Sequence, residues 1–136
     1  MLGRRTSLVA LIYEVDVAPV AFASSYSRGA IGATGYMIGY VYRGNNTYTS
    51  STVVWEKSVD GGDTFTTVSA GGDNAIVYDD IAVYGASSSR YRGRTTLTIS
   101  NLENGDYGLY RIKAIDDSSG DTLTSYSQNF DFSNPA

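Results

Sequence analysis

The side chains of this 136-residue sequence that could do acid–base or metal chemistry are mainly carboxylates, with 14 acidic residues against 10 basic ones. The chain contains no histidine and no cysteine. It therefore lacks the usual general base, the commonest metal ligand and any thiolate nucleophile or thiolate metal ligand. The chemistry left open to the acidic residues is Ca²⁺ binding or glycoside hydrolysis by a carboxylate pair.

Five of the 14 acidic residues form two groups that the sequence predicts to lie in turns. These are Asp79-Asp80 and the group Asp116, Asp117 and Asp121. No Ca²⁺-binding loop of the form D-x-[DN]-x-[DN]-G with a closing Glu accompanies them. Solvated turn residues explain both groups better than a metal or catalytic site does. We therefore expect a protein that is not an enzyme and uses no metal or cofactor.

Residues 58–65, SVDGGDTF, match the Asp-box pattern S-x-D-x-G-x-T-W, with Phe65 at the aromatic position. In sialidases this motif recurs on successive propeller blades, whereas a propeller needs at least four blades and this chain has one copy. The sequence instead predicts a hairpin turn in which Asp60 caps backbone amides, with Ser58 and Gly62 in the same turn.

Short runs rich in Thr, Tyr, Val and Ile, separated by turn signals, fill the chain from residue 36 onward. The expected strands are 36–42, 52–58, 64–69, 75–84, 90–100, 108–115 and 122–132. This spacing is typical of a sandwich or barrel, so we predict an all-β fold.

The first 34 residues differ from the rest. Residues 8–17 predict one apolar strand with Glu14 and Asp16 on a single face, and Ala18-Pro19 then breaks it. Residues 24–35 are small, polar and Gly-rich, which indicates a flexible connection or an extended arm. We therefore divide the chain into residues 1–34, an arm or extra strand for docking, and residues 35–136, a β-sandwich.

Two neighbouring segments resemble strands E and F of immunoglobulin domains. Leu97, Ile99 and Leu102 fit the pattern L-x-I-x-x-L. Asp106 and Tyr110 fit D-x-G-x-Y-x-C, with Ile112 at the cysteine position. Trp55 fits the tryptophan of strand C, and Val41, fourteen residues earlier, stands where the first cysteine would be. The segment 90–93, RYRG, is similar to the R-F-S-G that opens strand D.

The resemblance implies an immunoglobulin-like antiparallel β-sandwich and a role for each matched residue. Tyr110 would turn its hydroxyl back onto the backbone as a tyrosine corner. Val41 and Ile112 would fill the volume of the missing disulfide, and Arg90 would pair with Asp106. Phage and bacterial domains of this type commonly lack the cysteine pair, so the resemblance favours that group.

Tyrosine is the most abundant aromatic residue, with 12 copies. Tyr36, Tyr40 and Tyr42 are expected on one face of a strand. Tyrosine is favoured both in strands and at binding surfaces, so the sequence leaves open whether this face packs or binds.

Charge and hydropathy restrict the partners. The net charge of −4 argues against nucleic acid, and no run approaches the ~20 apolar residues that cross a bilayer. Together with the arm and the absent catalytic residue types, this favours a virion structural protein of a tailed phage, assembled in the host cytoplasm. It would be a capsid decoration, cement or tail-surface subunit present in many copies.

Under this hypothesis, residues 1–34 dock onto capsid or tail proteins. The sandwich projects outward and either stabilises the particle or binds host-surface glycans weakly. The alternative is a bacterial cell-surface adhesin or a carbohydrate-binding immunoglobulin-like module.

Overall fold

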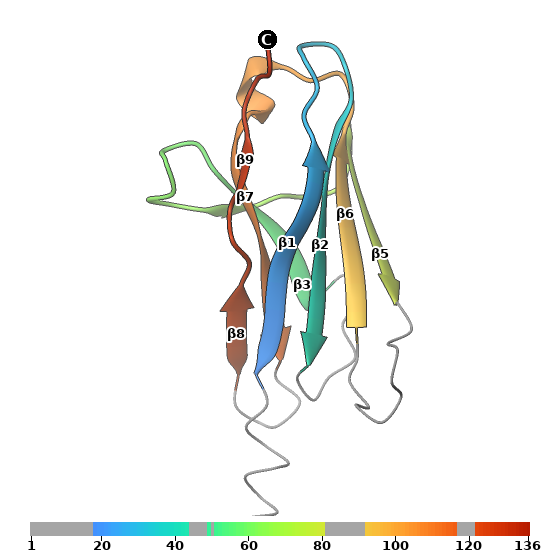
Figure 1. Cartoon of the computed structure of the whole chain (residues 1–136), viewed down its shortest axis with the longest axis vertical. Helices are drawn as coiled ribbons and strands as arrows, with labels where there is room; N and C mark the ends of the chain where they lie inside the picture. Colours follow the sequence, from blue (N-terminus) through green and yellow to red (C-terminus); the bar gives the residue numbers. More distant parts are fainter. Residues whose placement is uncertain (1–17, 44–48, 50, 81–91, 117–121) are drawn as a thin grey trace, which may run out of the picture.

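A computed structural model describes residues 18–43, 49, 51–80, 92–116 and 122–136. Two antiparallel sheets pack face to face, which confirms the predicted all-β sandwich (Figure 1). Helical structure in the described ranges is limited to the short 3₁₀ turn η2 (Asn104–Asp106), and none of it is long and apolar enough to cross a membrane.

The first sheet has the strand order β1-β2-β6-β5 and the second has the order β4-β3-β7-β8, with β9 also pairing with β7. The strands of the first sheet are β1 (Pro19–Ser27), β2 (Gly35–Arg43), β6 (Arg92–Ile99) and β5 (Asn74–Asp80). Those of the second are β4 (Thr66–Thr67), β3 (Val53–Ser58), β7 (Gly108–Asp116), β8 (Leu123–Tyr126) and β9 (Phe130–Phe132).

The alternation of apolar and polar residues explains which face of each strand is buried. In β7, Tyr110, Ile112 and Ala114 are buried, whereas Arg111 and Lys113 between them are half-buried. The same period of two places β6 with its Leu and Ile inward. The matched residues of the immunoglobulin pattern that lie in the core are Val41, Trp55, Leu97, Ile99, Leu102, Tyr110 and Ile112.

Trp55 occupies the middle of the core and is completely buried. Its indole Nε1–H donates to Oγ1 of Thr95 on the opposite sheet at 2.8 Å, and its ring lies 5.4 Å from that of Phe130. A buried indole N–H would be costly without an acceptor, so this hydrogen bond satisfies Trp55 and fixes its orientation.

The hydroxyl of Tyr110 donates to the carbonyl oxygen of Asp106 at 2.5 Å, which is the bond that the tyrosine corner implied. The Asp106 carboxylate accepts the backbone N–H of Glu103 at 2.8 Å and so caps η2. The predicted partner of Asp106, Arg90, lies outside the described residues. The described cation near Asp106 is Lys57, whose pKa is lowered by burial and held up in part by that carboxylate.

Ile112 packs against a glycine of β2. A Cβ built on Gly39 would overlap Cδ1 of Ile112 and would lie 3.0 Å from its Cγ1. The Ile112 side chain therefore fills the space that a side chain at position 39 would take. Val41 is also fully buried, and the prediction that it shares the disulfide volume with Ile112 stays a prediction.

Strand β1 lies within the stretch that the sequence divided off as residues 1–34. It pairs with β2 from Pro19↔Arg43 to Ser27↔Tyr36, with a register shift between Ala23 and Ser25. Proline is tolerated here because it is the first residue of an edge strand and its missing N–H leaves no ladder bond unmade. Residues Pro19–Ser27 therefore form a strand of the sandwich, and residues 1–17 lie outside the described part.

Two expected strands are shorter in the structure. The run 64–69 narrows to β4, and the run 122–132 divides into β8 and β9. The division falls at Ser127, whose hydroxyl accepts the backbone N–H of Ile112 at 2.9 Å. The Ser127 backbone N–H still donates to the Ile112 carbonyl, but the Ile112 N–H is bonded to a side chain, so regular pairing is interrupted there and resumes on a second segment of β7.

Candidate binding face

The outer face of the first sheet carries aligned rows of side chains, because directly paired residues of neighbouring strands point to the same side. One row crosses all four strands and consists of Phe22, Tyr40, Arg94 and Asp79. It therefore runs from two aromatic rings to a guanidinium and a carboxylate.

Two further rows follow it on the same face, one after the other along β2. One contains Ser25, Ile38, Thr96 and Val77, and the other contains Ser27, Tyr36, Thr98 and Ala75. Val77 is 51% exposed and Tyr36 is 40% exposed, so apolar and aromatic surface here contacts solvent. We call the residues of these three rows, together with Tyr42, the binding face.

The aromatic rings at the β1–β2 end of this face contact one another. Phe22 stacks on Tyr40 with ring centroids 5.4 Å apart, and meets Tyr42 edge to face at 5.5 Å. Such pairs stabilise neighbouring strands and hold the rings in fixed positions. The register and these contacts confirm that Tyr36, Tyr40 and Tyr42 lie on one strand face.

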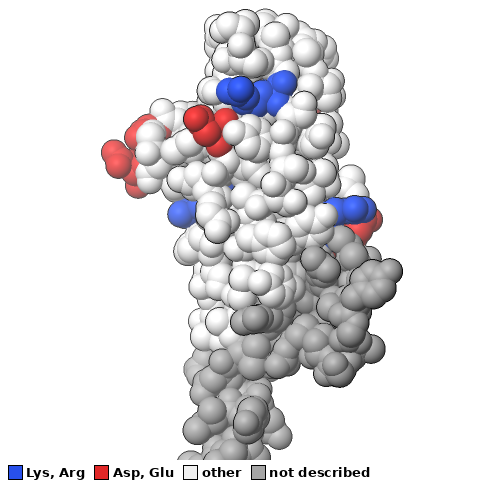
Figure 2. Space-filling view, viewed as in Figure 1, with Lys and Arg blue, Asp and Glu red and all other residues white. Residues whose placement is uncertain are grey.

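The charges on the binding face neutralise each other. Arg94 donates to Asp79 at 3.2 Å, and this bond, together with one to Tyr40, holds the pKa of Arg94 above its ordinary value. On the side of the molecule that Figure 2 shows, the charged side chains of the described residues are few and stand apart from one another. The face therefore fits a neutral partner surface better than a strongly charged one.

The tyrosines as a whole do not form one surface. Tyr110 is buried in the core, and Tyr107 donates its hydroxyl to the carbonyl of Gly29 at 2.6 Å. Tyr26 packs edge to face on Phe130. Tyr48, Tyr84 and Tyr91 lie outside the described residues.

The predicted hairpin turn after β3 is confirmed and projects from the sandwich between β3 and β4 (Figure 1). The Ser58 hydroxyl donates to Asp60 at 2.6 Å and accepts the backbone N–H of Gly62 at 2.9 Å. Asp60 also accepts from the backbone N–H of Thr64 at 2.9 Å. These bonds to Ser58 and Thr64 lower the pKa of Asp60. Gly61 and Gly62 have φ of 78° and 100°, which explains the glycine pair.

A stacked cation on the outer face of the second sheet was not predicted from the sequence. The Arg111 guanidinium lies between two rings, 3.8 Å from the centroid of Phe65 and 4.0 Å from that of Tyr126. Its Nε donates to the buried Glu56 carboxylate at 2.8 Å. Phe65 belongs to the hairpin, so this stack fastens the hairpin to the sheet. The only sequence signal was the aromatic position of the Asp-box.

The binding face offers contact surface rather than reactive groups. In the described part of the chain, no three acidic side chains come together as a metal site would require. No protein-family model matches the chain, and no curated protein sequence matches it.

Proposed function

We propose that this chain is a non-enzymatic virion structural protein, a capsid decoration, cement or tail-surface subunit, and that it contacts neighbouring capsid or tail proteins through the binding face. The observation that carries the proposal is the neutral aromatic surface of the first sheet, built from rows that cross four strands. Such a surface favours association over catalysis.

The composition of the face is that of a protein interface. Tyr36 and Tyr42 supply large rigid contact area at a low cost in conformational entropy. The Arg94–Asp79 pair lies at the β6–β5 end of its row and provides a polar rim, which sets register more than affinity. Many copies on one particle would convert weak single contacts into strong attachment.

The strand arrangement supports the finer proposal of an immunoglobulin-like topology. Strands β1, β2, β6 and β5 share one sheet while β4, β3, β7 and β8 share the other. The burial of Trp55 on β3 and the Tyr110–Asp106 bond support that proposal as well. We propose on this basis a disulfide-free immunoglobulin-like module.

The proposal is tested with particles that lack the protein. Wild type, Tyr36→Arg and a control, Val59→Ser, are added to the emptied capsids of the virus that encodes the gene, and co-sedimentation and heat resistance are measured. Val59 is 78% exposed but lies on the hairpin, away from the binding face.

Wild type and Val59→Ser should bind and raise the heat resistance of the particle. Tyr36→Arg should bind at least about tenfold more weakly, because it buries an unpaired charge in the interface. Equal binding of all three proteins would refute the role of this face. A wild type that ignores the particles would refute the virion assignment.

One observation favours a second candidate, a glycan-binding surface module. The row of Phe22, Tyr40, Arg94 and Asp79 places aromatic rings beside a guanidinium–carboxylate pair, and sugars are bound by ring stacking together with hydrogen bonds of this kind. A glycan array probed with wild type and Tyr40→Ala separates the candidates. Binding by wild type that Tyr40→Ala loses would establish this second function.

A further inference from the structure

The two edges of the first sheet are covered differently. At the β1 edge, the second sheet supplies side-chain partners: the Ser125 hydroxyl donates to the Pro19 carbonyl at 2.6 Å, and the Gln128 side chain accepts the Ala23 N–H at 3.3 Å. At the β5 edge, the pairing found among the described residues is a single bridge, Gly71↔Asn74. An edge strand with exposed backbone groups is a template for another strand.

The bridge shows which backbone groups of β5 point outward. Both the N–H and the carbonyl of Asn74 bond to Gly71, each at 2.9 Å, so Asn74 turns its backbone away from β6. In an antiparallel strand the direction alternates, so Ile76 points its N–H and carbonyl to the same outer side. Next to the bridge, Ile76 therefore presents its backbone N–H and carbonyl along the outer edge of β5.

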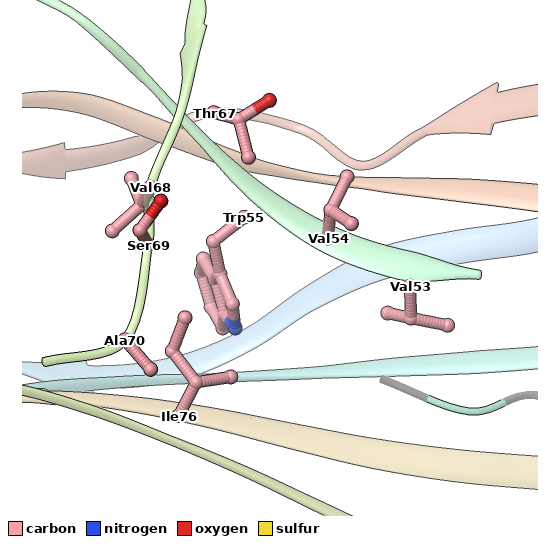
Figure 3. A pocket seen from close by; sticks show the side chains of 8 residues that line it. All are labelled: Val53, Val54, Trp55, Thr67, Val68, Ser69, Ala70 and Ile76. Carbon is pink, nitrogen blue, oxygen red and sulfur yellow. The ribbon is translucent and has the colours of Figure 1, made fainter. Parts of the chain in front are cut away.

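An apolar groove runs beside this edge, between the two sheets (Figure 3). It has a volume of about 450 Å³ and is lined by Val53, Val54, Trp55, Val68, Ala70 and Ile76, together with Thr67 and Ser69. Trp55 lies beneath the groove and is fully buried. A strand added to β5 would direct alternate side chains into this groove.

The sequence contains a segment with the matching pattern, residues 8–17, LVALIYEVDV. With a period of two, one face carries only apolar and aromatic residues, namely Val9, Leu11, Tyr13, Val15 and Val17. The other face carries both carboxylates, Glu14 and Asp16. A strand of this pattern can cover an apolar groove with one face and meet solvent with the other.

We propose that residues 8–17 of one copy of this chain add as a strand to the β5 edge of a second copy, with Val9, Leu11, Tyr13, Val15 and Val17 covering the groove. This goes beyond the proposed function, because it assigns a self-association site and does not depend on a capsid or a glycan.

The connection to β1 requires the donor to be a different copy. Val17 and Pro19 are separated by one residue, so their Cα atoms are at most about 7.6 Å apart. Strands β2 and β6 lie between β1 and β5. A strand beyond β5 is therefore about four inter-strand spacings from β1, or roughly 19 Å. A segment that pairs through Val17 cannot reach the β5 edge of its own sandwich.

Charge selects the antiparallel orientation. A parallel strand would place Glu14 and Asp16 at the end of β5 that carries Asp79-Asp80. An antiparallel strand brings Arg4-Arg5 toward that end and moves the two carboxylates to the other, where Asp73 is the one acidic neighbour in sequence. The antiparallel arrangement therefore pairs more opposite charges and fewer like charges.

The test measures the mass of the full-length protein against concentration by sedimentation velocity, for wild type, Leu11→Glu and Ile12→Glu. The two variants introduce the same charge at adjacent positions on opposite faces of the segment. Both positions precede β1, and the fluorescence of the buried Trp55 reports whether the sandwich stays folded.

Wild type and Ile12→Glu should associate alike as concentration rises, and Leu11→Glu should associate at least about tenfold more weakly. Hydrogen exchange in residues 74–80 should slow on association in wild type and not in Leu11→Glu. A wild type that remains monomeric, equal weakening by both variants, or association that leaves exchange in β5 unchanged would overturn the proposal.

Discussion

Replacing Gly39 by alanine should destabilise the sandwich because the new methyl group has no room. The added Cβ would overlap Cδ1 of Ile112 and would lie 3.1 Å from the carbonyl oxygen of Phe22. The backbone itself would accept alanine, since Gly39 is not among the glycines with positive φ. The effect of the substitution therefore reports packing between the two sheets.

The expected change in the free energy of unfolding is the balance of two opposing effects, overpacking of the core and reduced freedom of the unfolded chain. Overpacking of a core costs about 1–3 kcal/mol, and the reduced freedom of the unfolded chain returns about 0.4–1 kcal/mol. We expect Gly39→Ala to lower the free energy of unfolding by about 1–2 kcal/mol. Ile112→Val removes Cδ1 and should cost about 1 kcal/mol alone. Because Val makes room for the methyl group, the double variant should be more stable than the sum of the two single effects by about 1 kcal/mol.

The assay is equilibrium urea unfolding followed by the fluorescence of Trp55, which is the only tryptophan of the chain and is fully buried. Gly105→Ala is the matched control, since a Cβ there meets nothing within 4 Å. It should leave the free energy of unfolding within about 0.5 kcal/mol of wild type. Strict additivity of the Gly39 and Ile112 substitutions would refute the packing argument.

Three other substitutions probe polar contacts. The pKa of Asp60 is lowered in the folded protein, so its ionised form stabilises the hairpin at pH values above the unfolded pKa of about 3.9. This stabilisation is lost as the pH falls below that value. The stability advantage of wild type over Asp60→Asn, measured by urea unfolding, should therefore shrink from pH 5 to pH 3. Burial raises the pKa of Tyr110, so the neutral tyrosine stabilises the folded protein at pH values below the unfolded pKa of about 10. This stabilisation is lost as the pH rises past that value. Tyr110→Phe should cost about 1 kcal/mol at pH 7 and should remove that alkaline loss, as thermal unfolding at pH 7 and pH 11 would show. Arg111→Met leaves the buried Glu56 carboxylate unpaired and should lower the free energy of unfolding by about 3 kcal/mol. If the double variant Arg111→Met with Glu56→Gln recovers part of that stability, the unpaired charge is the cause.

The strand content and most of the core follow from local sequence. Leu97 and Ile99 alternate with polar residues, and Tyr110 and Ile112 do the same, so their burial is readable from the period alone. The hairpin at Asp60 is also local, because its bonds join residues no more than four apart. Local patterns of this kind need no knowledge of which strands become neighbours.

Features that depend on contacts between distant strands could not be predicted from the sequence. Gly39 looks like an ordinary strand glycine until the packing of the two sheets brings Ile112 over it. Arg111 gains its role from Phe65 and Glu56, which lie on other strands or loops. The sequence did not predict strand β1, because the serine-rich second half of this strand is exposed and shows no alternation of apolar and polar residues.

The covering of the β1 edge also sets an order of events during synthesis. Ser125 and Pro19 are 106 residues apart, and Gln128 and Ala23 are 105 apart. At translation rates of about 5–20 residues per second, Ser125 and Gln128 are synthesised roughly 5–20 s after the β1 residues that they bind. During that time a nascent chain can pair β1 with β2 but has neither Ser125 nor Gln128 to protect the outer edge. Chains growing side by side on one messenger are therefore most exposed to strand pairing with each other before their last residues are added.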